Sequence, residues 1–478
     1  MLKAVEFSDK AYIDGRWQEV SGPSVPVVDP ETEAVTGHIR LGGRAEVDSA
    51  VAAARRAFET YSRTTPEERR ALLERIVALL EDRAEEFADA IVTEMGAAIG
   101  FVRASQIPFG IEHFRVQAEV LKTYPFLRTE GHVAVAKEPI GVCALITPWN
   151  WPLYQITAKV APALAAGCTV ILKPSELSPY SALLFAKVID DAGVPPGVFN
   201  MINGSGEVVG AALSSHPGID MISITGSTRA GVLVAQAAAP TVKRVVQELG
   251  GKSPNIFLDD ADFASAIGRG VLTGMRNVGQ SCSAPTRMLV PASRLEEAER
   301  LAVAAAAEIK VGDPRDEATA MGPIANAAQY ARVQEMIQAG IDDGARLLIG
   351  GLGRPEGLEH GYYVRPTIFS GVTPDMRIAQ EEIFGPVLAI MPYADEADAV
   401  RIANDTVYGL GAHVQSADLV RARAFARQVR AGQVHINYPA WSGFAPFGGY
   451  KQSGNGREYA DWGIHDFLEV KGIVGYGG

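Results

Sequence analysis

The sequence predicts an α/β fold with more than one parallel sheet, on two observations. The first is length: the chain has 478 residues, whereas a single hydrophobic core stops growing at roughly 250 to 300 residues, so two or three domains are expected. The second is an alternation from Gly141 onward, where helical stretches separate the short apolar runs GVCALITP, TVILKP, FNMING and MISITG. PNIFLDD, TRMLVP and QVHINY are similar candidate strands in the second half. Strand-like runs that alternate with helical segments are typical of βαβ units.

Other parts of the chain lack that alternation. Residues 47–61 and 67–96 carry apolar residues at helical spacing with charges between them, so we expect a mainly helical segment over about the first hundred residues. Residues 123–137 and 467–476 look like β segments without a partner in either sheet. Gly250 and Gly251 indicate a hinge between two α/β domains.

Composition narrows the class of protein. Lys and Arg number 44 against 56 Asp and Glu, and the resulting net charge of −12 disfavours nucleic acids and anionic membranes as partners. The cysteines Cys143, Cys168 and Cys282 show neither CxxC nor His-rich spacing, so we expect no disulfide framework and no metal site. The sequence has neither an apolar leader nor a run of about 18 apolar residues. We therefore expect a soluble, cytoplasmic protein.

Two glycine-containing strings point to chemistry. GQSCSAPTR (279–287) places Cys282 in a polar loop, where a thiol can be exposed and polarised, whereas Cys143 and Cys168 lie in or beside apolar runs. QELGGKSP (247–254) places Glu248 just before two glycines. A nucleophilic thiol needs a base, and a carboxylate with a pKa raised by burial can serve. The alternatives are a buried free cysteine and a solvated carboxylate at a helix end.

Further strings occur in a fixed order with these two. They are YIDGRW (12–17), TPWNWP (147–152), KPSE (173–176), ITGSTRAG (224–231), EEIFGP (381–386) and PFGGYKQSG (446–454). With them the sequence resembles the aldehyde dehydrogenase superfamily, of the NAD(P)-dependent, hydrolytic, non-acylating type, nearly from end to end. The resemblance implies two Rossmann-like open parallel-sheet domains and a small β domain for oligomerisation, and thus a dimer or tetramer. It places the NAD-binding domain at 1–122 and 140–249, the catalytic domain at 250–448, and the oligomerisation segments at 123–139 and 449–478.

The resemblance also implies catalytic roles. Cys282 attacks the aldehyde, and Glu248 activates the water that hydrolyses the resulting thioester. Asn150, together with the Cys282 backbone N–H, stabilises the oxyanion. Lys159 and Glu458 relay protons away from Glu248. Read without the family, Asn150 is a turn residue, and Lys159 and Glu458 are solvated side chains.

Expulsion of hydride requires a cofactor, because no side chain accepts hydride. The GxGxxG pattern is absent, and ITGSTRAG offers instead a strand-to-helix junction that can hold a pyrophosphate. We expect NAD rather than NADP, because Glu176 would repel a 2′-phosphate. The implied cofactor-binding residues are Ile146, Thr147, Pro148, Trp149, Lys173, Ser175, Glu176, Gly206, Gly226, Ser227, Leu249, Glu382 and Phe384.

The predicted substrate pocket is an aromatic-lined tunnel. By resemblance it comprises Trp151, Gln155, Ala158, Ser281, Trp441 and Phe447. No arginine stands at these positions, which disfavours small semialdehyde acids, although Arg103 or Arg276 could reach in from loops.

The predicted function is NAD-dependent oxidation of an aldehyde to a carboxylic acid. One alternative is an acylating relative that transfers the acyl group to coenzyme A; relatives of that kind often lack a glutamate at the position of Glu248. The other is a catalytically silent binding or structural protein on the same scaffold, and the joint presence of Cys282, Glu248 and Asn150 argues against it.

Overall fold

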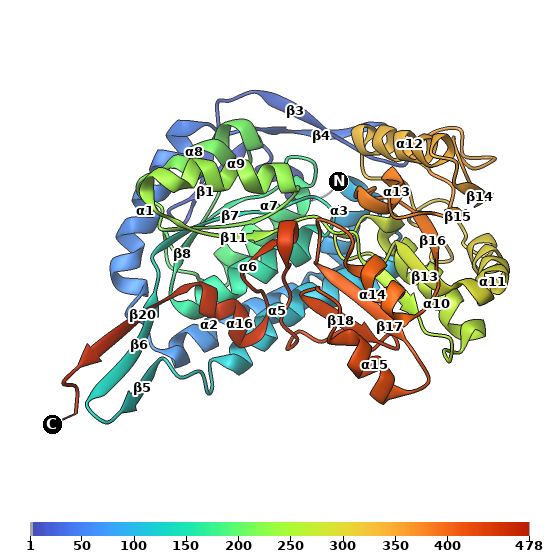
Figure 1. Ribbon diagram of the computed structural model, residues 1–478. Helices are drawn as coiled ribbons and strands as arrows, with labels where there is room; N and C mark the ends of the chain where they lie inside the picture. Colours follow the sequence, from blue (N-terminus) through green and yellow to red (C-terminus); the bar gives the residue numbers. More distant parts are fainter. Residues whose placement is uncertain (1–2, 478) are drawn as a thin grey trace.

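Two open, mostly parallel sheets with helices on their faces dominate the structure, a computed structural model that describes residues 3–477 (Figure 1). Two smaller antiparallel sheets complete it. In Figure 1 one large sheet lies on the left of the view and the other on the right. The α/β prediction with parallel sheets is therefore confirmed.

The N-terminal segment departs from the prediction, because its first forty residues are mainly strands rather than helices. β1 (Lys10–Ile13) and β2 (Arg16–Glu19) form a hairpin, and β3 (Ser24–Val28) pairs with β4 (Val35–Arg40). Asp14 and Gly15 turn the first hairpin with positive φ angles of 55° and 72°. An Asp-Gly pair between short strands is a strong hairpin signal, and it outweighs the helical pattern that begins only later.

Helices then follow as expected. They are α1 (Arg44–Tyr61), α2 (Pro66–Asp82), α3 (Ala84–Met95), the short α4 (Ile99–Phe101) and α5 (Ile107–Val120). A π-helical turn, Val102–Gln106, joins α4 to α5.

The first large sheet has the strand order β19-β11-β10-β7-β8-β9-β1-β2. Its central strands are parallel, and β7, β8, β9 and β10 are buried along their whole length, as expected for a sheet covered on both faces. The strands are β7 (Val142–Ile146), β8 (Thr169–Lys173), β9 (Phe199–Met201), β10 (Met221–Thr225), β11 (Arg244–Glu248) and β19 (Gly454–Asn455). The connecting helices are α6 (Pro152–Ala166), α7 (Pro179–Asp191), α8 (Ala211–Ser215) and α9 (Thr228–Ala238).

The second large sheet has the order β14-β15-β16-β13-β12-β17-β18, parallel except for β14. Its strands are β12 (Pro254–Phe257), β13 (Arg287–Pro291), β14 (Arg346–Ile349), β15 (Thr367–Ser370), β16 (Val387–Tyr393), β17 (Gly411–Gln415) and β18 (Gln433–Ile436). Its helices are α10 (Phe263–Met275), α11 (Leu295–Ala307), α12 (Ala327–Asp342), α13 (Arg377–Gln380), α14 (Glu396–Asn404) and α15 (Leu419–Ala426).

The two β segments that lacked a partner in sequence pair with each other. β20 (Leu468–Val474), which follows α16 (Ala460–Asp466), runs antiparallel to β6 (Val133–Pro139), and β6 also pairs with β5 (Leu127–Glu130). Figure 1 shows this three-stranded sheet projecting from the body of the molecule near the C-terminus. The proposed domain boundaries stay a prediction; β19 lies within the predicted 449–478 segment but pairs with β11 of the first sheet.

Candidate active site

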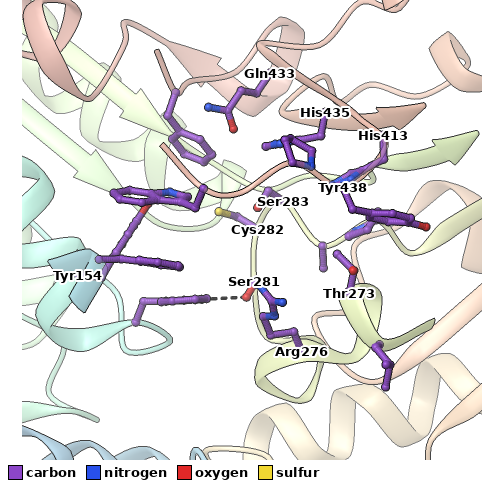
Figure 2. Close-up of a pocket in the computed structure, with 18 of the residues that line it drawn as sticks. Tyr154, Thr273, Arg276, Ser281, Cys282, Ser283, His413, Gln433, His435 and Tyr438 are labelled. Carbon is purple, nitrogen blue, oxygen red and sulfur yellow. Dashed lines mark hydrogen bonds between the residues drawn. The ribbon is translucent and has the colours of Figure 1, made fainter. Parts of the chain in front are cut away.

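A cavity of about 420 Å³ lies where the two large sheets meet (Figure 2). The first sheet contributes Trp151, Tyr154 and Gln155, which follow the carboxyl end of β7. The second sheet contributes residues 281–285 before β13, and side chains of β17 and β18. Cys282 lies in the wall of this cavity.

The loop before Cys282 has an unusual backbone. Asn277, Val278 and Gly279 have consecutive φ angles of 55°, 60° and 69°, which is strained for the two residues that carry a Cβ. A Cβ at Gly279 would lie 2.1 Å from the Gly385 carbonyl oxygen, so only glycine fits there. The buried Asn277 amide holds the turn: Nδ2 donates to the Asn150 carbonyl at 2.9 Å, and Oδ1 accepts from Gln106 at 3.1 Å.

The predicted residues Asn150 and Trp151 bind directly to the cysteine loop. Asn150 Nδ2 donates to the Gln280 carbonyl at 3.0 Å, and Trp151 Nε1 donates to Ser281 Oγ at 2.8 Å. The amide of Asn150 carries a second N–H that this bond does not use. Two strings more than a hundred residues apart in sequence are thereby joined at the two residues that precede Cys282.

The thiol of Cys282 is not polarised toward thiolate, contrary to the expectation from its polar neighbours. Burial raises its pKa, and the nearby carboxylates of Glu382, Glu248 and Glu458 raise it further. The thiol is therefore neutral at pH 7 in this structure and depends on a base to become a nucleophile.

Glu248 ends β11 and is 2% exposed. Neither of its carboxyl oxygens has a hydrogen-bond partner, and it is not among the side chains that line the cavity. Burial raises its pKa well above the ordinary value, and the charge of Glu458 adds to this. A Cβ at Gly448 would lie 2.8 Å from Glu248 Oε1, so glycine at that position leaves room for the carboxyl group.

Lys159 and Glu458 form a buried ion pair rather than solvated side chains. They are 1% and 5% exposed, and Lys159 Nζ lies 2.7 Å from Glu458 Oε1. Lys159 also donates to Ser223 Oγ at 3.0 Å. Since the charges of Lys159 and Glu458 both act on the pKa of Glu248, the three side chains form one electrostatic group behind the cavity.

The carboxyl edge of the first sheet leaves buried polar atoms unpaired. Thr147 after β7, Asn203 after β9 and Thr225 at the end of β10 have side-chain oxygen or nitrogen atoms without a partner. The same holds for Glu248, the last residue of the neighbouring strand β11. Buried polar groups in proteins are normally hydrogen-bonded. This edge, where open α/β sheets bind their ligands, therefore fits a polar ligand such as a dinucleotide.

The other predicted cofactor residues border the same edge. Ser227 caps α9 by accepting from the Ala230 N–H at 3.2 Å, and the Gly226 N–H donates to the Glu248 carbonyl. Lys173 and Glu176 form an ion pair at 3.1 Å. The remaining positions are as follows: Ile146 ends β7 and Pro148 follows it by two residues, Ser175 is buried, Gly206 begins a π-helical turn, and Leu249 lies against Gly231.

The predicted nicotinamide-side residues come from the opposite sheet. Glu382 accepts from the Gly251 N–H at 3.0 Å, and burial raises its pKa to about 7. Phe384 has a positive φ of 58° and meets Trp149 edge to face at 5.5 Å. A non-glycine residue held in this conformation requires support from its surroundings, which the Trp149 contact provides.

Aromatic rings line one side of the cavity, as predicted for the substrate pocket. Trp151, Gln155, Ser281, Trp441 and Phe447 all line it. Ala158 is buried within α6 and is not among the lining residues, because the helix carries it deeper than Gln155. Arg103 does not reach the cavity; its guanidinium binds Glu85 and Glu317.

A model of the aldehyde dehydrogenase family matches residues 17–473. The chain belongs to the aldehyde dehydrogenase family. A 3-succinoylsemialdehyde-pyridine dehydrogenase from a Pseudomonas species is 55% identical over 98% of both chains. Among solved structures, a cysteine-to-alanine mutant of aldehyde dehydrogenase C from Pseudomonas syringae, complexed with NAD+ and octanal, has a TM-score of 0.98 and 62% identity, covering 99% of this chain and 98% of the other. An aldehyde dehydrogenase of Mycobacterium tuberculosis complexed with NAD+ has a TM-score of 0.95 and 40% identity over 98% of each chain.

Sequence reasoning missed several side chains of this aldehyde dehydrogenase's cavity. Tyr154 stands three residues after Trp151 and one before Gln155, a helical spacing that indicates a shared face and that could have identified it. Arg276, which the sequence named as able to reach in, does line the cavity. No local signal marks the other missed lining residues, which include Phe109, Arg269, His413, Gln433, His435, Tyr438 and Tyr459. They come from separate elements and meet only in the fold.

Residues 3–477 of this aldehyde dehydrogenase contain neither a group of metal-binding side chains nor a helix suited to span a membrane. No three His, Cys, Asp or Glu side chains in this range gather in a way that could hold a metal ion. Within the same range no helix combines the length and apolar character needed to cross a membrane.

Proposed function

We propose that this protein oxidises an aldehyde to a carboxylic acid with NAD as hydride acceptor, through a thioester on Cys282, followed by hydrolysis. The observation that carries the proposal is the joining of the Asn150 amide to the loop that places Cys282 in the cavity wall. The NAD+ complexes of similar aldehyde dehydrogenases and the unpaired polar atoms at the first sheet's carboxyl edge support the choice of cofactor.

In the first half-reaction, Cys282 Sγ attacks the aldehyde carbon and the thiol proton passes to a base. Because the thiol pKa is raised, the thiol needs a base to lose its proton. We assign this role to Glu248, one of the carboxylates that act on the thiol. The carbonyl oxygen becomes an oxyanion, which the Asn150 amide and the Cys282 backbone N–H stabilise. Loss of one such donor typically lowers kcat by about 10²- to 10³-fold.

NAD, when bound, supplies the acceptor for the hydride that leaves the thiohemiacetal carbon. The protein then holds the acyl group as a thioester of Cys282. Residues of the first sheet's edge, including Thr147, Thr225 and Ser227, would bind the cofactor, and Glu382 would bind it from the opposite side.

Before the second half-reaction Glu248 releases the thiol proton. As a carboxylate again, it removes a proton from water, and the water attacks the thioester. The carboxylic acid leaves and Cys282 regains its proton. Since Glu248 does not line the cavity in this structure, its side chain must turn toward Cys282 to act. The Lys159–Glu458 pair lies behind Glu248 and provides a path for its proton. A glutamate suited to this task supports hydrolysis over transfer to coenzyme A.

We further propose that the protein acts as a homo-oligomer, a dimer or tetramer, in the cytoplasm. The three-stranded sheet supports assembly, because β20 is an edge strand with exposed Val470 and Val474. The free thiols of Cys143, Cys168 and Cys282 are consistent with a reducing compartment.

The test is NADH formation by Cys282→Ala with a panel of aldehydes. We expect activity to fall at least about a thousandfold, because the covalent step is lost. Cys143→Ala and Cys168→Ala are matched controls that should stay active, since both thiols are buried away from the cavity.

Full activity in Cys282→Ala would refute the mechanism. The same assay with added coenzyme A separates the alternatives: an acyl-coenzyme A product, with no free acid, would favour the acylating reaction.

A further inference from the structure

The cavity wall formed by α10, β17 and β18 is basic. Arg276, His413 and His435 line it, and no Asp or Glu side chain lines the cavity among the residues the structure describes. This absence stands out in a chain with a net charge of −12. Figure 2 shows His413, His435 and Tyr438 on one side of Cys282, with Tyr154 on the other.

Arg276 carries a charge with no counter-ion. Within residues 3–477 its guanidinium makes neither an ion pair nor a hydrogen bond. Partial desolvation therefore lowers the pKa of Arg276 with no opposing interaction. The Arg276 side chain is nonetheless exposed, and it lines the cavity. The neighbouring Arg269 differs, because it donates to the Tyr438 carbonyl at 3.1 Å and lies over the Tyr438 ring. Arg276 is thus the one of these two arginines that is available to a ligand.

The two histidines beside it are neutral and stacked. Their ring centroids are 4.6 Å apart, because His413 of β17 and His435 of β18 are register partners. Burial, together with smaller effects of the nearby His435 and Arg276, lowers the pKa of His413 to about 3. His413 Nδ1 is buried without a hydrogen-bond partner. Arg276 lines the same cavity as the two imidazoles, and its charge acts on His413.

We propose that Arg276, His413 and His435 bind a carboxylate at the end of the substrate remote from the aldehyde, so that the preferred substrates are ω-oxo carboxylates with an apolar body. This rests on the aldehyde oxidation proposed above. An unpaired guanidinium matches a carboxylate in charge and geometry, and the imidazoles add hydrogen-bonding atoms. The aromatic rings on the other side, such as Trp151 and Trp441, would pack against the apolar body.

The test compares ω-oxo carboxylates with the n-alkanals of equal chain length, from about four to ten carbons, so that each pair differs only in its terminal group. In the wild type we expect a higher kcat/KM for the carboxylate at one or more lengths. Arg276→Met should lower that value at least about tenfold, chiefly through KM, while alkanal oxidation changes less than about twofold. Arg103→Met, an arginine outside the cavity, is the matched control and should leave both series unchanged.

A second measurement does not depend on turnover. Titration calorimetry with a saturated dicarboxylate of the best chain length should show binding to the wild type and at least about tenfold weaker binding to Arg276→Met. An unchanged ratio of carboxylate to alkanal kcat/KM in Arg276→Met, together with equal dicarboxylate binding, would overturn the inference. Dicarboxylate binding that depends on Arg276, without oxidation of either series, would instead refute the proposed function and leave the carboxylate site standing.

Discussion

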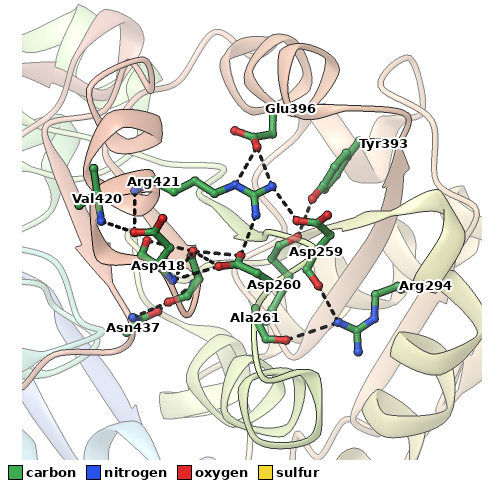
Figure 3. Close-up of polar contacts among 12 residues, drawn as sticks. Asp259, Asp260, Ala261, Arg294, Tyr393, Glu396, Asp418, Val420, Arg421 and Asn437 are labelled. Carbon is green, nitrogen blue, oxygen red and sulfur yellow. Dashed lines mark hydrogen bonds and ion pairs between the residues drawn. The ribbon is translucent and has the colours of Figure 1, made fainter.

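The two large sheets differ in whether the polar groups at the carboxyl ends of their parallel strands are paired. In the first sheet, the polar side chains of Thr147, Thr225 and Glu248 are buried with unpaired atoms. In the second sheet, the corresponding edge is closed by ion pairs and hydrogen bonds (Figure 3). There Arg421 reaches Asp259, Asp260 and Glu396 at 2.6, 3.1 and 2.6 Å.

The closed edge is supported from several elements. Tyr393 at the end of β16 donates to the Phe257 carbonyl of β12 at 2.7 Å. Asp260 accepts from Ser416 Oγ at 2.8 Å and from the Asp418 N–H at 3.0 Å. These bonds pair polar groups at or just after the ends of β16, β12 and β17, so the groups do not need a ligand as a hydrogen-bond partner.

The difference indicates that the edge with unpaired polar groups is suited to bind a ligand, whereas the edge with paired groups stabilises the fold. A parallel sheet usually binds its ligands at the carboxyl ends of the strands, and the unpaired polar groups of the first sheet fit this rule. The second sheet reverses it, because the loop carrying Cys282 and the start of β17 and β18 meet the cavity from the amino ends. Unpaired polar groups lower stability in the free protein, so the binding edge is expected to trade stability for function.

The largest expected effect that tests this comparison is in Glu248→Gln. We expect kcat to fall at least about a hundredfold, because the amide cannot take a proton from water. A burst of NADH and an acyl-enzyme detected by mass spectrometry should accompany the loss. The Tm should stay equal or rise, since a buried carboxyl that is costly to ionise is replaced by an uncharged amide of similar shape. A normal rate of thioester hydrolysis would show that another group activates the water.

The stability gain of Glu248→Gln should depend on pH. Because the folded-state pKa of Glu248 is raised, the folded protein keeps a proton that the unfolded chain releases above about pH 4.3. Wild-type stability therefore falls as the pH rises from that value toward the folded-state pKa, whereas the variant lacks this loss. The Tm difference should widen with pH, and a constant difference would contradict the raised pKa.

A smaller effect is expected for cofactor choice, which we expect to depend on Glu176, three residues after β8. A 2′-phosphate about 4 Å from this carboxylate would be repelled by on the order of 4 kcal/mol per charge pair at an effective dielectric near 20, before relaxation and salt. Lys173 is already paired with Glu176 and offsets part of this. We expect the wild type to favour NAD over NADP at least about tenfold in kcat/KM, and Glu176→Gln to relax the preference through KM. An unchanged preference would remove Glu176 from the cofactor site.

Replacing one unpaired hydroxyl should have a milder effect. Thr225→Val should raise KM for NAD about three- to tenfold, the value of one neutral hydrogen bond, with no loss of Tm. Thr169→Val is the matched control within the same sheet: Thr169 Oγ1 is buried and donates to the Ala54 carbonyl at 3.1 Å. The control should lose Tm and keep its KM, and the reverse pattern would break the distinction between paired and unpaired groups.

The smallest effect is expected at the closed edge. Arg421→Ala should lower stability by about 1 kcal/mol, since the ion pairs are partly exposed, and should leave kcat and KM unchanged. Partial burial raises the pKa of Asp260, but its bonds to Ser416 and Asp418 and the charge of Arg421 outweigh this, so the pKa lies below its ordinary value. The stabilisation is present above about pH 4 and is lost at lower pH, where the two proteins should converge in Tm.

Local sequence patterns were sufficient for the features that depend on local backbone. The alternating apolar runs predicted the parallel sheets, and the strings around Cys282, Glu248 and Asn150 led to residues that the fold brings together or places in one electrostatic group. Glycines mark these strings because a side chain cannot be accommodated there, as at Gly279. The N-terminal hairpin was missed although its Asp14-Gly15 turn is equally local, because the helical pattern of later residues was extended over it.

By itself, then, the sequence determined the family and the fold class and predicted Cys282 as the nucleophile, because each of these inferences depends on contiguous residues. Only the tertiary structure decided the chemical state of the site. The raised pKa of Cys282 reflects burial together with Glu248, Glu382 and Glu458, which are carboxylates from three separate segments. The basic wall of Arg276, His413 and His435 likewise comes from elements far apart in sequence. A pKa depends on burial and on all charges nearby in space, and these neighbours are brought together only when the chain folds.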